Sequence, residues 1–358
     1  MKEQVKTISF EGQNIYVGID VHLKNWVVTV MLDHLTYKTF SQNPCAVDLA
    51  NYLKRNFPGG TYYSAYEAGF CGFSAHRELE AHGITNIVLN PADIPTTDKE
   101  RKQKEDRRDS RKIAKSLCNG ETIGIYVPSE SAIAVRDFVR YRRTLVKEIT
   151  RNKCRVKSLL YFHGINIPLE MDSASKYWSA KFTQWLRELS FHSPYSGELL
   201  VHSIDITEQL RSKLLKVTQQ LRGILKTSPY SAKLKLLTSV PGIGKITAIT
   251  LLSEIEDINR FKNLDKLCSY VGLIPTMSSS GERDSTGSIT SRSNNILRSM
   301  LIESAWVAIK HDPSLALAFN NLSKRMKKNE AIVRIAKKLL SRIQYVLKND
   351  KEYVCNVV

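Results

Sequence analysis

The order of apolar segments in the first third of the chain constrains its fold more than any other feature of the sequence. Three runs typical of β-strands, residues 14–22, 26–32 and 36–41, follow one another across short polar turns and predict an antiparallel meander. Helix and strand patterns then alternate at residues 44–57, 61–69, 73–83 and 84–91. Hairpin strands followed by such an alternation are typical of an α/β domain with a mixed sheet.

The remainder of the chain is predicted to be mainly helical. A long basic helix is expected from Ser129 to about Tyr161, and residues 196–227 show a helical period with coiled-coil character. That second stretch could pack on its own domain or on another subunit. Residues 276–295 are polar and rich in Ser and Gly, a composition that predicts a linker. We therefore expect three parts, residues 1–160, 161–232 and 233–358.

Composition disfavours several classes of protein. The sequence has no uninterrupted apolar run of membrane-spanning length, and its first residues lack the apolar core of a signal peptide. We therefore expect a cytoplasmic protein without a membrane partner. The six cysteines form no C-x-x-C pair and the eight histidines show no metal-ligand spacing, so a zinc site is not expected.

The charge is strongly positive and unevenly distributed. The chain carries 53 Lys and Arg against 35 Asp and Glu, a formal net charge of +18. Residues 1–100 hold 8 Lys and Arg and 11 Asp and Glu, so the positive excess lies in the rest of the chain. A near-neutral front followed by a basic remainder favours a polyanionic partner, and nucleic acid is the expected one. A soluble basic protein with solvated faces is the alternative.

Four carboxylates are candidates for a metal site. Asp20 and Glu67 each end a strand pattern, in GIDVH and AYEAG, and Asp106 and Asp109 share one face of a predicted helix. Carboxylates that converge repel one another unless divalent cations hold them together, and oxygen donors favour Mg²⁺ or Mn²⁺. A pair of such ions can stabilise the attacking and leaving oxygens in phosphoryl transfer. Alternatively, the strand acids are ordinary turn residues and the helix pair is a solvated face.

The motif VPGIGKITAITLLSEI predicts two helices joined by a tight glycine turn. Gly242 and Gly244 would let the backbone approach a phosphate, N–H groups of the second helix would point at that anion, and Lys245 would add charge. The pattern is typical of a helix-hairpin-helix element, which grips the DNA backbone without reading its sequence. A plain turn between core helices is the alternative.

The polar segment contains three consecutive serines, Ser278, Ser279 and Ser280, before Gly281. A serine nucleophile needs activation, because the free hydroxyl reacts weakly, and no histidine lies nearby in the sequence. Chemistry at this segment would have to use a base or a metal from elsewhere.

Together and in this order, the motifs resemble those of the DEDD-type insertion-sequence transposases, a family described as bridge-RNA-guided recombinases. GIDVH, YEAG and K-x-D-x-x-D resemble its RuvC-like domain, and the PGIG turn, G-L-I-P, S-S-G, G-x-I-T and L-x-E-x-A-W resemble its C-terminal transposase domain. The resemblance covers nearly the whole chain. It implies an α/β ribonuclease H-like (RuvC-like) N-terminal domain, followed by mainly α-helical coiled-coil and C-terminal domains.

The resemblance also implies a role for each matched residue. Asp20, Glu67, Asp106 and Asp109 would bind Mg²⁺ or Mn²⁺, and Ser280 would form a phosphoserine link to DNA. With the basic helix included, the residues expected to contact nucleic acid are Gly242, Gly244, Lys245, Arg292, Arg140, Arg143 and Lys147. The partners would be donor and target DNA, a noncoding guide RNA and further copies of the chain, in a dimer to tetramer. The protein would be associated with the nucleoid of a bacterium or archaeon.

The sequence departs from the family pattern at two positions. Ser110 stands where an Ala usually follows the second helix Asp, and Ser293 stands where a Gly precedes Asn294, in the loop that carries Arg292. Two other functions compete with the recombinase: a RuvC-like nuclease that cuts DNA with metal-activated water, and a non-catalytic nucleic-acid binder. The four carboxylates disfavour the binder, and only the recombinase needs Ser280.

Overall fold

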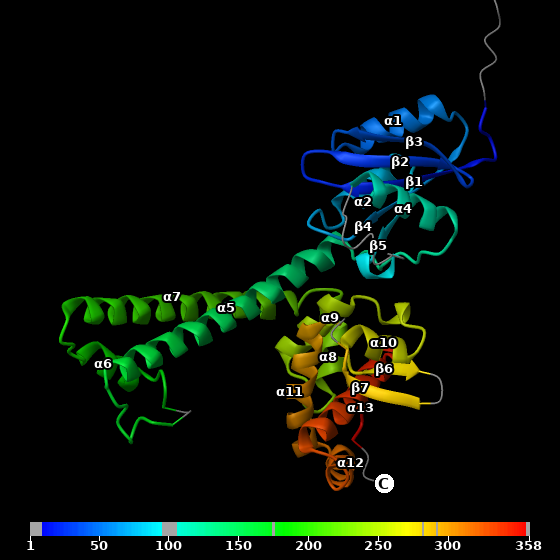
Figure 1. The fold of residues 1–358 in the computed structure, drawn as a ribbon. Coiled ribbons are helices and arrows are strands. Elements are labelled where there is room, and N and C mark those ends of the chain that lie inside the picture. The colour runs from blue at the N-terminus through cyan, green and yellow to red at the C-terminus, as the bar shows by residue number, and fades with distance from the viewer. Residues whose placement is uncertain (1–8, 95–105, 174–175, 281–282, 291–292, 356–358) are drawn as a thin grey trace, which may run out of the picture. The chain divides into compact units, whose positions relative to one another are not determined.

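The apolar runs of the first third form one mixed sheet of five strands, in a computed structural model that describes residues 9–94, 106–173, 176–280, 283–290 and 293–355 (Figure 1). The strands are Asn14–Val21 (β1), Trp26–Leu32 (β2), Leu35–Gln42 (β3), Thr61–Glu67 (β4) and Thr85–Leu89 (β5). Their order is β3-β2-β1-β4-β5; the pairs among β1, β2 and β3 are antiparallel, whereas β4 is parallel to both β1 and β5. The predicted mixed α/β sheet is confirmed, and it is compatible with a ribonuclease H-like domain.

Helices cover both faces of this sheet. The elements are Ala46–Asn56 (α1), Ser74–Ala81 (α2), the short Pro91–Asp93 (η1) and Asp106–Cys118 (α4). Because side chains alternate along a strand, Ile15, Val17 and Ile19 of β1 point to one face, where they pack in one core with residues of α1 and α2. The opposite face is covered by α4, which contacts β1, β2 and β4.

Gly18 explains how closely α4 approaches the sheet. A Cβ atom at Gly18 would overlap the carbonyl oxygen of Ser110 and the backbone of Ala114, so only glycine leaves room for the helix at this point of β1. The fully buried Ser110 hydroxyl lies 2.9 Å from that of Thr29 on β2, and Thr29 lies 2.9 Å from Thr39 on β3. The serine that departs from the family pattern therefore bonds α4 to the sheet.

Contacts divide the chain into two compact units, Met1–Val127 and Pro128–Val358. The second unit begins with the predicted long basic helix, Glu130–Phe162 (α5), which pairs with Pro194–Ile224 (α7) and is followed by the short Ala180–Glu188 (α6). The buried Asn152 of α5 donates to the Thr207 hydroxyl of α7 at 2.6 Å. The stretch with coiled-coil character thus packs within its own chain, and its contacts group α5 with this second unit.

Further helices of the second unit surround a separate apolar core. They are Tyr230–Thr238 (α8), Lys245–Ile255 (α9), the short Ile258–Arg260 (η2), Leu264–Val271 (α10), Asn295–His311 (α11), Pro313–Ser323 (α12) and Lys328–Asn349 (α13). Helix α9 is buried along most of its length, and α13 contributes a continuous apolar stripe to the same core. None of the helices that the structure describes is both long and apolar enough to cross a membrane.

The polar segment predicted to be a linker is instead a β-hairpin. Strands Pro275–Ser280 (β6) and Arg283–Ile289 (β7) pair antiparallel, with Ser280 opposite Arg283 beside the turn. The prediction of a linker from composition was wrong because backbone hydrogen bonds between two strands need no apolar side chains. At the open end, the Thr290 N–H donates to the Ile274 carbonyl, which continues the pairing past β7.

Candidate active site

The carboxyl ends of β1 and β4 place two of the four predicted carboxylates on neighbouring strands. Ile19 is in register with Tyr66, and Asp20 and Glu67 are the next residues of these parallel strands. Since paired positions of parallel strands point to the same face, both acids belong to the face that Gly18 presents to α4. Both are half-buried.

A third carboxylate comes from the first turn of α4. Asp106 and Asp20 both approach His22, whose Nε2 lies 3.1 Å from Asp20 Oδ2 and 3.4 Å from Asp106 Oδ2. The potential ligand atoms of all three residues lie within 4.8 Å of one another. The close approach of α4 at Gly18 thus brings together residues far apart in the sequence.

His22 is a site residue that sequence reasoning missed. It directly follows β1, where its backbone N–H donates to the Asn25 carbonyl at 3.1 Å and so closes the turn to β2. The signal was its spacing: two residues after Asp20, a side chain returns to the same face of a strand. The sequence analysis compared the spacing of histidines only with other histidines, so it could not detect a histidine whose partners are carboxylates.

The electrostatics of the cluster favour a bound cation. Burial raises the pKa of the Asp20 carboxyl, the charges of Asp106 and Asp109 raise it further, and His22 opposes them. Asp109 also lies near Lys112, with 3.9 Å between Oδ1 and Nζ. Carboxylate oxygens with one imidazole nitrogen suit a divalent metal ion, so Asp20, His22 and Asp106 fit the Mg²⁺ or Mn²⁺ that the sequence predicted.

The predicted glycine turn between α8 and α9 is present. Packing requires a glycine at one of its two glycine positions but not at the other. Gly242 has a φ of +86°, and a Cβ there would overlap the Ser304 carbonyl of α11, so Gly242 is required by helix packing. Gly244 is the N-cap of α9 and a Cβ there would meet no described heavy atom within 4 Å. Lys245 is the first residue of α9.

The serine motif belongs to the second unit. Ser278, Ser279 and Ser280 end β6, and Ser280 is the last residue before the hairpin turn. Gly281 and Arg292 lie outside the described residues.

Comparisons with known proteins agree with the order of these elements. Residues 17–164 match the family model of a DEDD transposase, and residues 234–320 match that of the transposase IS116/IS110/IS902 family. The chain is 30% identical over 359 residues to the putative transposase y4rJ of Sinorhizobium fredii, which covers 91% of this chain and 90% of that protein. The chain belongs to this transposase family.

Other relatives extend the comparison. The transposase is 29% identical over 244 residues to the putative transposase y4qE of Sinorhizobium fredii, over 68% of its own length and 58% of that protein. It is 26% identical over 354 residues to the pilin gene-inverting protein of Moraxella lacunata, over 94% of its own length and 97% of that protein. The predicted enzyme class, a DNA transposase or recombinase, is confirmed.

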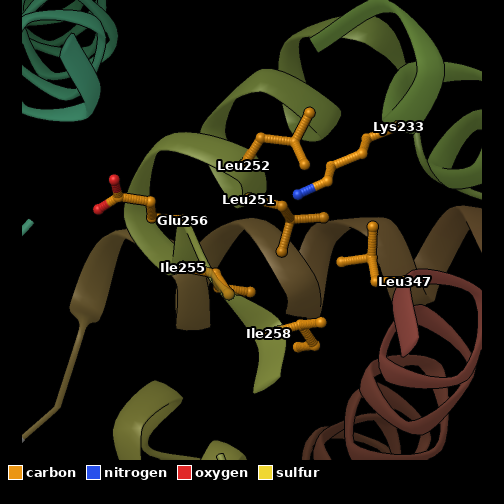
Figure 2. Close-up of a pocket in the computed structure, with 7 residues that line it drawn as sticks. All are labelled: Lys233, Leu251, Leu252, Ile255, Glu256, Ile258 and Leu347. Carbon is orange, nitrogen blue, oxygen red and sulfur yellow. The ribbon is translucent and has the colours of Figure 1, made fainter. Parts of the chain in front are cut away.

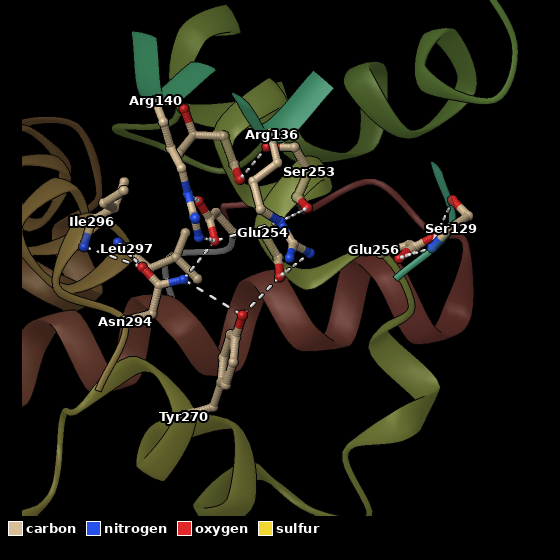
Figure 3. Close-up of polar contacts among 11 residues, drawn as sticks. Ser129, Arg136, Arg140, Ser253, Glu254, Glu256, Tyr270, Asn294, Ile296 and Leu297 are labelled. Carbon is tan, nitrogen blue, oxygen red and sulfur yellow. Dashed lines mark hydrogen bonds and ion pairs between the residues drawn. The ribbon is translucent and has the colours of Figure 1, made fainter. Parts of the chain in front are cut away.

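A polar network holds the basic helix α5 of the transposase against its C-terminal helices (Figure 3). At its centre lies Glu254 of α9, whose side chain is 0% exposed. Arg140 donates to both carboxylate oxygens at 2.8 and 2.9 Å, and Asn294, the N-cap of α11, donates to one of them at 2.8 Å. Arg143, in turn, donates to Ser299 of α11 at 3.1 Å. Arg140 and Arg143 therefore have structural partners, whereas Lys147 is exposed on the same helix.

Two hollows of the second unit differ in what they can hold. The one drawn in Figure 2 has a volume of about 10 Å³, which is room for about one water molecule, and apolar residues of α9 and α13 line it. Its lining also includes Lys233, whose side chain points toward Leu251 and Leu252, and Glu256, whose carboxylate points away from them. The other is a groove of about 1470 Å³ that runs from the β6–β7 hairpin to α13. Its lining includes Arg298, Arg334, Lys337 and Lys338.

Proposed function

We propose that this transposase cuts and rejoins DNA through a Ser280 nucleophile, assisted by a divalent metal ion at Asp20, Glu67, Asp106 and Asp109. The observation that carries the proposal is the convergence of Asp20 and Asp106 at the end of β1, since two carboxylates repel one another unless positive charge lies close to both. A divalent cation there would stabilise charge on the oxygens of a phosphodiester. The protein side chains would orient that phosphodiester and take up or release protons around it.

The proposed chemistry conserves the energy of the phosphodiester bond. The Ser280 oxygen would bond to phosphorus, the bond from phosphorus to one DNA strand would break, and that strand would leave as a hydroxyl that takes up the serine proton. The protein-linked phosphate could then be transferred to the hydroxyl of another strand without an external cofactor. The position of Ser280 supports the proposal, because it is the last residue of β6 and pairs with Arg283 at the end of the two-stranded sheet, away from the Thr290–Ile274 hydrogen bond.

We further propose that the specificity of the reaction comes from a noncoding guide RNA and that several copies of the chain assemble on donor and target DNA. The excess of positive charge supports polyanionic partners. Self-association would let the carboxylates of the first unit and Ser280 of the second act on the same DNA. RNA that copurifies with the protein and maps next to its gene would support the guide, and light scattering that detects only monomer, with and without nucleic acid, would contradict assembly.

The deciding experiment traps the protein on DNA. The transposase is incubated with end-labelled DNA and Mg²⁺, denatured, and the labelled peptide is mapped. We expect the phosphate on Ser280, no adduct for Ser280→Ala, and a normal adduct for the matched variant Ser278→Ala. Asp20→Asn is expected to abolish both adduct and strand exchange while binding DNA normally, since it removes a metal ligand without removing a core side chain.

Two results would change the proposal. A label on Ser278 or Ser279 would transfer the role to that residue. DNA cleavage without any adduct, at the same rate in Ser280→Ala as in the wild type, would mean that water is the nucleophile and that the protein is a RuvC-like nuclease.

A further inference from the structure

His22 contacts two carboxylates through a single nitrogen atom. Nε2 carries at most one hydrogen, and one N–H bond points well at only one acceptor. Nε2 lies 3.1 Å from an Asp20 oxygen and 3.4 Å from an Asp106 oxygen, so three atoms with lone pairs lie close together. A single hydrogen bond accounts for only one of these contacts, and the second is an ion pair only if the imidazole is protonated.

A metal ion accounts for both contacts. In an octahedral site with metal–ligand bonds of about 2.1 Å, neighbouring ligand atoms lie roughly 3.0 Å apart, because such bonds meet at right angles. The separations of His22 Nε2 from the two carboxylate oxygens are close to this spacing, and all three atoms lie within 4.8 Å of one another. Three ligands of one ion, with the nitrogen next to each of the two oxygens, are consistent with this arrangement.

The surrounding structure holds these ligands in place while leaving the site open. His22 is fixed by the hydrogen bond from its backbone to Asn25, and α4, which carries Asp106, is fixed against Gly18. The side chains of His22 and Asp106 are 36% and 50% exposed. Further coordination positions therefore face solvent, as a site that receives a phosphate oxygen requires.

We propose that His22 is a nitrogen ligand of the metal ion, beside Asp20 and Asp106, and that it makes the site prefer Mn²⁺ to Mg²⁺. Imidazole suits transition-metal ions, whereas Mg²⁺ favours carboxylates, carbonyl groups and water. A site built from carboxylates alone would discriminate less between the two ions, since carboxylate oxygens suit both Mg²⁺ and Mn²⁺. The inference rests on the proposed function, since it needs the carboxylate site to bind metal, but it concerns a residue outside the four predicted acids.

Pulsed electron paramagnetic resonance on Mn²⁺ tests the ligand directly, without measuring activity. The full-length protein is made with ¹⁵N-labelled histidine and loaded with Mn²⁺. We expect a ¹⁵N hyperfine coupling that is lost in His22→Gln and retained in His34→Gln, a matched change at an exposed histidine on the β2–β3 turn. The free Mn²⁺ signal should show affinity lowered about tenfold to a hundredfold in His22→Gln, by analogy with the loss of groups that support metal ligands.

Competition by Mg²⁺ tests the preference. Wild-type protein should need an excess of Mg²⁺ over Mn²⁺ for half displacement, and His22→Asp, which offers oxygen in place of nitrogen, should need less. Equal affinities of the wild type for the two ions would overturn the claimed preference.

The outcomes separate this inference from the proposed function. Bound Mn²⁺ without ¹⁵N coupling in the wild type would overturn the role of His22, whatever the folding of the variants, while the carboxylate site would stand if Asp20→Asn lost the ion. If the wild type bound no more Mn²⁺ than Asp20→Asn, the metal site of the proposed function would itself be wrong.

Discussion

Glu254 gives Arg140 and Asn294 a structural role inside the second unit. Its carboxylate is fully buried and binds Arg140 with both oxygens, Arg136 lies 3.7 Å away, and Asn294 donates to the same group. Buried carboxylates persist only where charge and hydrogen bonds compensate their desolvation. The positive charge of α5, which the sequence suggested was directed at nucleic acid, is thus partly used inside the fold.

Replacement of Glu254 should therefore destabilise the protein strongly. Glu254→Ala removes the acceptor of hydrogen bonds from Arg140 and Asn294. Because the Arg140 side chain is 48% exposed and can be solvated, the expected loss is about 1.5–3 kcal/mol, the range for hydrogen bonds to a charged group, and is less than for a fully buried ion pair. The control is Glu208→Ala, whose carboxylate pairs with Arg187 while 50% exposed, and which should cost no more than about 1 kcal/mol. Urea denaturation of the full chain measures both. Equal losses for the two variants would show that the Glu254 network does not stabilise the fold.

At the scale of elements, the sequence predicted the sheet well and its packing poorly. Apolar runs bounded by short polar turns identified β1 to β5, because strands that are buried on one or both faces are rich in apolar residues. They could not show that Gly18 contacts α4, because that contact depends on a helix that comes much later in the chain. The β6–β7 hairpin was not predicted, because its residues are polar and show no apolar pattern.

The same limits apply to the candidate site. Motif order predicted Asp20 and Asp106 as partners, and the structure brings them together beside His22, the last residue of GIDVH, to which the sequence analysis assigned no role. Ser110 appeared in the sequence only as a departure from a family pattern. In the fold its hydroxyl lies within hydrogen-bond distance of Thr29 on β2, so its structural role could not be seen from the sequence of the helix alone.

The packing of α4 on β1 yields a prediction at this scale. Gly18→Ala places a methyl group where the backbone of Ser110 and Ala114 now lies, so α4 must move away or the unit must lose stability, by about 1–3 kcal/mol for an overpacked core. Because α4 carries Asp106, Mn²⁺ binding and recombination should both fall. Gly223→Ala on α7 of the second unit is the control, since a Cβ there would meet no described heavy atom within 4 Å. Unchanged Mn²⁺ affinity in Gly18→Ala would separate the site from the position of the helix.

For the whole molecule, charge and chemistry divide between the two units. Residues 1–127 hold 16 Lys and Arg against 15 Asp and Glu, while residues 128–358 hold 37 against 20. The carboxylate cluster belongs to the nearly neutral unit, and almost the entire positive excess belongs to the other. This division suits a protein that attracts nucleic acid with the second unit and keeps the proposed metal ligands in the first.

Binding of duplex DNA should therefore depend strongly on salt through the second unit. Each phosphate that a cation neutralises releases counterions, which gives a slope of roughly −0.9 in log K against log salt concentration. Removing one contacting cation should lower the magnitude of the slope by about 1. We expect this for Lys147→Ala on α5, while Lys54→Ala on α1, an equally exposed lysine of the first unit, should leave the slope unchanged. Fluorescence anisotropy across a salt series measures both variants.

Two outcomes would contradict this prediction. A slope near zero for the wild type would contradict a phosphate-binding role for the basic unit. An effect of Lys54→Ala equal to that of Lys147→Ala would mean that the first unit contributes to binding as much as the second.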